Sequence, residues 1–121
     1  MPSKILVIED NLINRMLLVD ILKVKGHSVT EADDGLSGIT LAQEEDFDLI
    51  LMDLNLPGID GLSATNTLRN NPKTKSVPII AITAHAMKGD EEKILASGCN
   101  AYIAKPIDTR QFVQIVAKFL A

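Results

Sequence analysis

The sequence predicts an α/β fold in which a five-stranded parallel sheet is doubly wound, with helices on both of its faces. Five strand-like segments alternate with five segments of helical periodicity along the 121 residues. Four of the strand-like segments are short, almost wholly apolar runs, which are typical of parallel strands buried on both faces. Alternating strands and helices imply right-handed crossovers, and these crossovers place helices over both faces of the sheet.

The strands are predicted from the apolar runs and from the polar residues that stop them. The segment 28–32 is more polar than the others, and Val29 is its one large apolar residue, so we expect it at an edge of the sheet. In chain order, the strands are expected at residues 5–8, 28–32, 48–53, 77–83 and 101–104.

The helices are predicted from apolar residues that recur at helical spacing. They are expected at residues 13–25, 35–45, 61–69, 87–97 and 109–120. Gly26 and Gly98 follow the first and fourth helices as capping glycines, and Pro72 helps to break the third. The apolar stripes of the first, second and last helices are Leu17, Leu18, Ile21, Leu22 and Val24; Leu36, Ile39 and Leu41; and Phe112, Ile115, Val116, Phe119 and Leu120.

The composition limits the class of protein. Residues 1–121 suffice for one domain that buries about two-thirds of its unfolded surface. With 12 basic and 16 acidic residues the net charge is −4, which lacks the basic footprint of a nucleic-acid binder. The single cysteine, Cys99, excludes an internal disulfide. The apolar runs are far shorter than the ~20 residues that cross a bilayer, and no signal peptide is present, so we expect a cytoplasmic protein with no membrane partner.

Chemically active side chains are predicted to meet at one rim of the sheet. Five strands fit the order 2-1-3-4-5, and ligands bind beyond the strand carboxyl ends where this order reverses, between strands one and three. Glu9 and Asp10 follow the first strand, and Asp53 ends the third. Thr83 ends the fourth strand and Lys105 follows the fifth, so a hydroxyl and an ammonium group join the three carboxylates.

This set of groups suits a divalent metal and a phosphoryl group. Clustered carboxylates raise one another's pKa unless a cation holds them, and Mg²⁺ prefers such oxygen ligands. Asp53 is the candidate nucleophile, because an aspartate can form an acyl phosphate. Thr83 can donate a hydrogen bond to one phosphoryl oxygen and Lys105 can pair with another. Phosphoryl transfer needs little more than this positioning and charge neutralisation.

The residues around these positions resemble the receiver domain of two-component response regulators. The matching motifs are Glu9-Asp10-Asn11, Leu51-Met52-Asp53-Leu54, Leu56-Pro57-Gly58-Ile59-Asp60-Gly61, Ile82-Thr83-Ala84 and Lys105-Pro106. They occur in the order and spacing of the family, and the resemblance covers essentially the whole chain. Within this family, the chain resembles single-domain members. It is also similar to the receivers of hybrid histidine kinases, including the asparagine at position 14 after the acidic pair. The resemblance implies a flavodoxin-like sheet order.

The resemblance implies a phosphoryl-accepting site that binds Mg²⁺. Asp53 would accept the phosphoryl group from a phosphohistidine of a sensor histidine kinase or a phosphotransfer protein. Glu9, Asp10, Asp53 and the backbone carbonyl of Asn55 would bind Mg²⁺, and Glu9 stands where an aspartate is also common. Lys105 would contact a phosphoryl oxygen.

The resemblance also implies a switch next to this site. Thr83 and Tyr102 would form the switch pair, and the bond before Pro106 would be cis. Asn55 and His85 would tune how fast the phosphoryl group is lost.

The implied function is that of a stand-alone phosphorylation-dependent switch in a phosphorelay. We expect a monomer or weak dimer without an effector domain, and no enzyme activity beyond self-catalysed phosphorylation and dephosphorylation. The surface around the fourth helix, fifth strand and fifth helix would control binding of a downstream protein. The fourth helix, with Gly89 inside it and Ile94 and Leu95 as its apolar anchors, is expected to be weakly held. Ile13 and Met16 fit either docking onto a kinase helix bundle or core packing.

Three alternative classes of protein share part of this pattern. A Mg²⁺-dependent phosphatase of the haloacid dehalogenase type usually has a second aspartate two residues after its nucleophile, where this chain has Asn55, and a cap insertion. A flavodoxin-like binding module favours a hydroxyl- and glycine-rich loop after the first strand, where this chain has two acids. The chain could also be a receiver fragment of a hybrid histidine kinase.

Overall fold

Strands and helices alternate along the whole chain. The computed structural model describes residues 3–56, 61–84 and 88–120, and within them five strands alternate with five helices. The strands are β1 (Lys4–Ile8), β2 (Ser28–Ala32), β3 (Leu49–Asp53), β4 (Ile79–Thr83) and β5 (Ala101–Ala104). The helices are α1 (Leu12–Val24), α2 (Gly35–Glu44), α3 (Gly61–Arg69), α4 (Lys88–Ala96) and α5 (Thr109–Leu120). The predicted and observed bounds differ by at most two residues.

All five strands are parallel and lie in the order β2-β1-β3-β4-β5. This order confirms the predicted fold class, and β2 is an edge strand, as expected from its polar sequence. The register pairs Ile8 with Met52 and Asp53 with Ile82, so β1, β3 and β4 end at the same rim. The chain adds β2 on one side of β1 and β3 on the other, so the direction in which strands are added reverses between β1 and β3. The three acidic residues lie at the ends of these two strands.

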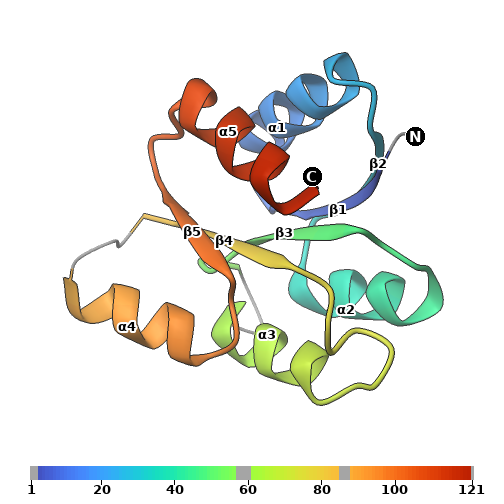
Figure 1. The fold of residues 1–121 in the computed structure, drawn as a ribbon, viewed down its shortest axis with the longest axis vertical. Helices are drawn as coiled ribbons and strands as arrows, with labels where there is room; N and C mark the ends of the chain where they lie inside the picture. The colour runs from blue at the N-terminus through green and yellow to red at the C-terminus, as the bar shows by residue number, and fades with distance from the viewer. Residues whose placement is uncertain (1–2, 57–60, 85–87, 121) are drawn as a thin grey trace.

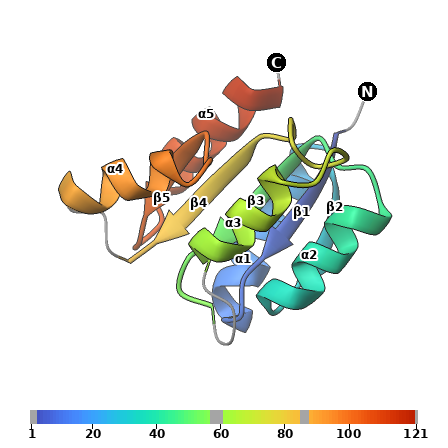
Figure 2. The same ribbon diagram turned by 90° about the horizontal axis from the view of Figure 1, so that it is seen from below.

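The helices form one layer on each face of the sheet (Figures 1 and 2). Helices α1 and α5 cover one face, and α2, α3 and α4 cover the other. Alternate residues of one strand face opposite layers: Ile5 and Val7 pack with α1 and α5, whereas Leu6 and Ile8 pack with α2 and α3. Among the described helices, none combines the length and the apolar character that a bilayer crossing needs.

Two details of the apolar pattern differ from the prediction. The run 101–104 is not buried on both faces, because β5 is the second edge strand: Ile103 is buried, but Tyr102 is half-buried and Ala104 is exposed. The apolar stripes are also wider than the covered helix faces. Val24 is 84% exposed and Leu36 is 66% exposed, because the sheet contacts only one side of each helix.

Glycines end α1 and α4 with left-handed backbones. Gly26 has φ +88° and Gly98 has φ +111°, and both lie just beyond their helices as predicted. A Cβ at Gly26 would meet nothing within 4 Å, whereas one at Gly98 would lie 2.7 Å from Cγ of Arg69. The Arg69 guanidinium donates hydrogen bonds to the Gly98 carbonyl (2.9 Å), the Val77 carbonyl (2.7 Å) and Asn100 Oδ1 (2.7 Å). Arg69 therefore ties the end of α3 to the segment between α4 and β5.

Alanine at the two glycines should separate backbone strain from crowding. Gly26→Ala should lower the free energy of unfolding by about 1–2 kcal/mol, because an L-residue there is strained in otherwise open space. Gly98→Ala should cost more, since the added Cβ also displaces Arg69. Urea unfolding followed by circular dichroism measures both losses, and equal losses would contradict the role of Arg69.

Candidate functional site

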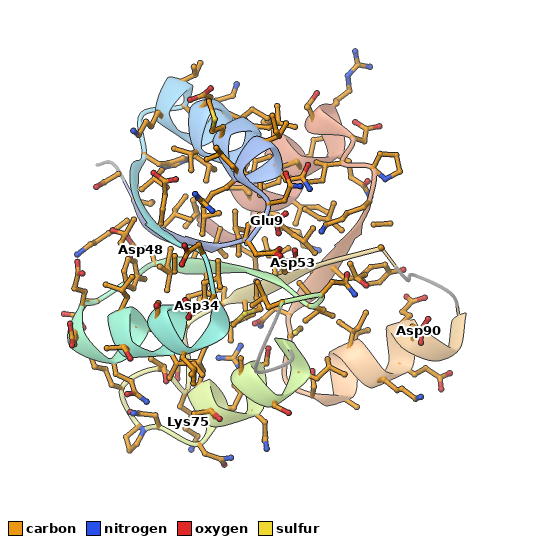
Figure 3. All side chains as sticks on the ribbon, turned by 180° about the vertical axis from the view of Figure 1, so that it is seen from behind. Glu9, Asp34, Asp48, Asp53, Lys75 and Asp90 are labelled. Atoms are coloured by element: carbon orange, nitrogen blue, oxygen red, sulfur yellow. The ribbon has the colours of Figure 1, made fainter. Side chains whose placement is uncertain are left out.

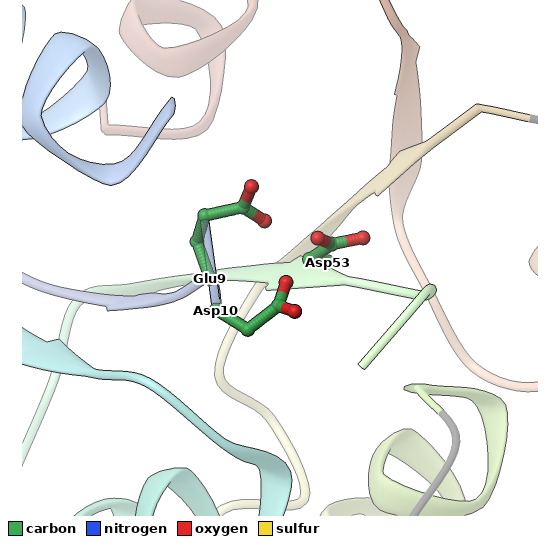
Figure 4. A group of neighbouring side chains, drawn as sticks. All are labelled: Glu9, Asp10 and Asp53. Carbon is green, nitrogen blue, oxygen red and sulfur yellow. The ribbon is translucent and has the colours of Figure 1, made fainter. Parts of the chain in front are cut away.

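Three carboxylates meet where β1 and β3 end (Figure 4). Glu9 and Asp10 directly follow β1 and Asp53 is the last residue of β3, and one oxygen of each lies within 4.8 Å of the others. Glu9 and Asp53 are fully buried, whereas Asp10 is exposed. Figure 3 shows Glu9 and Asp53 side by side, while Asp48 and Asp90 lie at the periphery. The structure thus brings the three predicted acids together.

Both oxygens of Asp53 have hydrogen-bond donors. The backbone N–H of Asn55 donates to Oδ1 at 2.8 Å, and Lys105 Nζ donates to Oδ2 at 3.0 Å. Lys105 Nζ also lies 3.7 Å from Glu9 Oε1, so one ammonium group forms ion pairs with both buried acids. The peptide bond between Lys105 and Pro106 is cis.

The two oxygens of Glu9 have different surroundings. Oε1 accepts a hydrogen bond from Nδ2 of Asn14 at 3.1 Å. Oε2 is buried and has no hydrogen-bond partner among the described residues. A buried carboxylate oxygen without a donor is costly, and it marks a position suited to a cation. Sequence reasoning noted Asn14 only as part of the family resemblance; its place in the first turn of α1, three residues after the capping Asn11, was the signal for this contact.

The remaining predicted residues lie around this centre. Thr83 is buried at the end of β4, and the Asn55 side-chain carbonyl accepts a hydrogen bond from the Ala84 N–H at 3.2 Å. Tyr102 pairs with Ala81 in the sheet and packs against the core on the α2–α4 face. Partial burial raises the pKa of Tyr102, and Glu91 of α4 beside its hydroxyl adds to the shift. His85 and residues 57–60 lie outside the described residues.

Comparison with known proteins decides the family. The family model described as "Response regulator receiver domain" matches residues 5–117 of the chain. The chain belongs to the response regulator receiver family. Its sheet order is that of a receiver from a two-component system.

Relatives include single-domain regulators and parts of larger proteins. The receiver is 41% identical over 120 residues to the polar-differentiation response regulator DivK of Brucella anthropi, covering 99% of this chain and 98% of that protein. Its fold matches the receiver domain of sensor histidine kinase PA1611 from Pseudomonas aeruginosa (TM-score 0.91, 38% identity, 99% and 98% coverage), which holds a magnesium ion in the active-site cleft. It also matches the receiver of Ssk1, crystallised with the histidine phosphotransfer protein Ypd1 of Saccharomyces cerevisiae (TM-score 0.91, 30% identity, 98% and 88% coverage).

In the receiver, the two buried acids have opposite pKa shifts. Burial raises the pKa of Glu9 to about 7, and the neighbouring Asp53 adds to the shift. Burial acts against the charge of Asp53, but the neighbouring Glu9 together with hydrogen bonds from the Asn55 N–H and Lys105 outweighs it and lowers the pKa of Asp53. Burial works against the charge of Lys105, yet Asp53 and Glu9 raise its pKa. Below about pH 7 the pair therefore holds one proton, on Glu9, while Asp53 is ionised.

The acidic cluster fits a hard divalent cation. It offers carboxylate oxygens from the residues that end β1 and β3, and one of them is Glu9 Oε2, which no described residue hydrogen-bonds. Mg²⁺ uses one or two carboxylates together with waters and phosphate oxygens, and the exposed Asp10 is the member of the cluster that faces solvent. A bound cation would take the place of the proton that Glu9 holds.

Removing the Glu9 charge should stabilise the metal-free protein at high pH. The pKa of Glu9 is about 7 when folded and 4.5 in an ordinary environment, so the folded state binds more protons between these values. The contribution of Glu9 to stability therefore falls as pH rises from about 4.5 to 7. Glu9→Gln should raise Tm at pH 8, with a gain that shrinks toward pH 5.

Calorimetric melting in EDTA at several pH values measures this effect. Added Mg²⁺ should raise the Tm of the wild type at pH 8 more than that of Glu9→Gln, because the variant lacks one cation ligand. A gain from Glu9→Gln that does not change with pH would contradict the assigned ionisation of Glu9.

Proposed function

We propose that the receiver is a phosphorylation-dependent switch in which Asp53 accepts a phosphoryl group from a phosphohistidine. The observation that carries the proposal is the buried Asp53 carboxylate at the strand reversal, in contact with Lys105 and beside Glu9 and Asp10. The donor is a sensor histidine kinase or a phosphotransfer protein. The complex of Ypd1 with the Ssk1 receiver supports a donor of this class.

In the transfer step, an oxygen of Asp53 forms a bond to phosphorus as the P–N bond of the phosphohistidine breaks. The electron pair of the broken bond returns to the imidazole nitrogen. Asp53 enters the reaction ionised, because its pKa is lowered. Lys105 neutralises one phosphoryl oxygen, and the Thr83 hydroxyl donates a hydrogen bond to another.

A magnesium ion supplies positive charge that offsets the repulsion between the carboxylates and the phosphoryl oxygens. Glu9, Asp10, Asp53 and the backbone carbonyl of Asn55 are its proposed ligands. Asn55 suits this role because its N–H already binds Asp53, which fixes the local backbone beside the site. The phosphoryl group is lost when a water oxygen attacks phosphorus and the bond between phosphorus and the Asp53 oxygen breaks. This step yields inorganic phosphate and the free carboxylate, and Asn55 and His85 tune its rate.

The input surface is the exposed apolar side of α1. Leu12, Ile13 and Met16 are 58%, 75% and 51% exposed, which removes them from the core. Beside them, a groove lined by Asn14, Leu17, Lys105, Pro106 and Ile107 leads to the acidic site. A donor protein that packs an apolar helical surface here brings its phosphohistidine to Asp53.

The output surface is formed by α4, β5 and α5. A phosphoryl group adds about −1.5 to −2 charges, draws the Thr83 hydroxyl and opens room for the Tyr102 ring. Among the described side chains of α4, only Ile94 is fully buried, and Leu95 is 45% exposed instead of anchoring the helix. A groove of about 550 Å³ beside Tyr102 lies between Leu95 and Gln111, and a downstream protein binds there.

Covalent phosphorylation at Asp53 is the first test. Intact mass after incubation with acetyl phosphate and Mg²⁺ should show one phosphate adduct on the wild type. Asp53→Asn should show none, because it lacks the nucleophilic carboxylate. The matched control Asp20→Asn, which changes an exposed aspartate of α1, should be phosphorylated like the wild type.

Two outcomes would overturn the proposal. An adduct that persists in Asp53→Asn would move the nucleophile elsewhere. Catalytic release of phosphate without any adduct would instead favour an aspartate-nucleophile phosphatase.

The switch predicts different effects for the ring and the hydroxyl of Tyr102. Tyr102→Ala should still be phosphorylated at Asp53, but hydrogen exchange in α4 should no longer respond to phosphorylation, since no ring turns inward. Tyr102→Phe, which keeps the ring, should retain the response. Loss of phosphorylation in Tyr102→Ala would contradict the assignment of Tyr102 to the output side of the switch.

A further inference from the structure

We propose that Asn14 is a positioning residue for the cation site, and that its side-chain amide holds Glu9 in the pose that leaves Oε2 for the metal. The inference deepens the proposed function, because it concerns the same site. It depends on Mg²⁺ binding at Glu9 and not on transfer of the phosphoryl group.

Glu9 needs such a partner because of its length. A glutamate has one more rotatable bond than an aspartate, so its carboxylate has more positions to choose from. In this chain it is fully buried, with Oε1 bound by Asn14 and Oε2 without a partner among the described residues. The Asn14 contact selects which oxygen is occupied, and therefore which oxygen remains for a cation.

The first turn of α1 is built to hold Asn14 in place. Asn11 caps the helix, and its Oδ1 accepts the Asn14 backbone N–H at 3.0 Å. The next residue, Arg15, donates from Nη1 to the Glu9 backbone carbonyl at 2.9 Å and from Nε to Glu31 at 3.2 Å. Neighbouring residues of one turn thus bind the backbone and the side chain of Glu9.

An amide suits this role better than a charged group. The Asn14 NH₂ donates a hydrogen bond but carries no net charge, so it orients Glu9 without competing with a cation for its negative charge. Lys105, 3.7 Å from the same Oε1, already supplies positive charge. Partners that orient metal ligands in this way typically change metal affinity roughly 10–100-fold when they are removed.

The test is the affinity for Mg²⁺ alone, measured by isothermal titration calorimetry at pH 8. Asn14→Ala should weaken binding roughly tenfold. Asn66→Ala, the same change on an exposed position of α3, should leave the affinity unchanged. In a Glu9→Asp background the Asn14→Ala change should have no further effect, because the shorter side chain does not reach Asn14.

A second measurement uses the wild type and does not depend on the variants folding. The side-chain NH₂ resonances of Asn14 should shift on addition of Mg²⁺, whereas those of Asn66 should not. Wild-type affinity in Asn14→Ala, an equal loss in the Glu9→Asp background, or an unmoved Asn14 resonance would each overturn the inference.

The outcomes separate this inference from the proposed function. Asn14-dependent Mg²⁺ binding without a phosphate adduct on Asp53 would support the inference and count against the switch. Phosphorylation of Asp53 together with unchanged Mg²⁺ affinity in Asn14→Ala would support the switch and overturn the inference.

Discussion

The mutual repulsion of carboxylates gathered at one end of the sheet is the constraint on which the rest of the site depends. A parallel sheet brings the ends of β1 and β3 together, so Glu9, Asp10 and Asp53 meet whatever their charges. Without a cation, the protein lowers this cost with a proton on Glu9 and the ammonium group of Lys105. A proton, the Lys105 ammonium group and a metal ion are thus three ways to neutralise the same carboxylates. A metal ion that binds Glu9 takes the place of the proton there.

The fold and most of the site were predictable because both follow from the order of elements along the chain. Apolar runs separated by helices determine a parallel sheet, and a parallel sheet places all residues that follow its strands at one rim. Asp53, Thr83 and Lys105 could therefore be assigned to one place from the sequence alone. The exposure of Ile13 and Met16, which the sequence left open, needed the structure.

Other features depend on geometry that a pattern of residues does not contain. Helical periodicity shows which face of α1 and α2 is apolar, but not how much of that face the sheet covers. Val24 and Leu36 were therefore assigned to the apolar stripes, although both side chains are exposed. The run 101–104 was expected to be buried on both faces, although the predicted strand order already put it at an edge. The contact between Asn14 and Glu9 depends on two side-chain rotamers, which the position of Asn14 in the first turn of α1 does not determine by itself.

The hydrogen bonds of Arg69 affect how firmly the two ends of α4 are held. Its guanidinium holds the Gly98 carbonyl, just past the carboxyl end of α4, together with Val77 and Asn100. Ile94, the fully buried residue among the described side chains of this helix, lies near the same end. α4 is therefore held most firmly at its carboxyl end, where Arg69 and Ile94 lie, whereas Asp90 near its amino end is only half-buried.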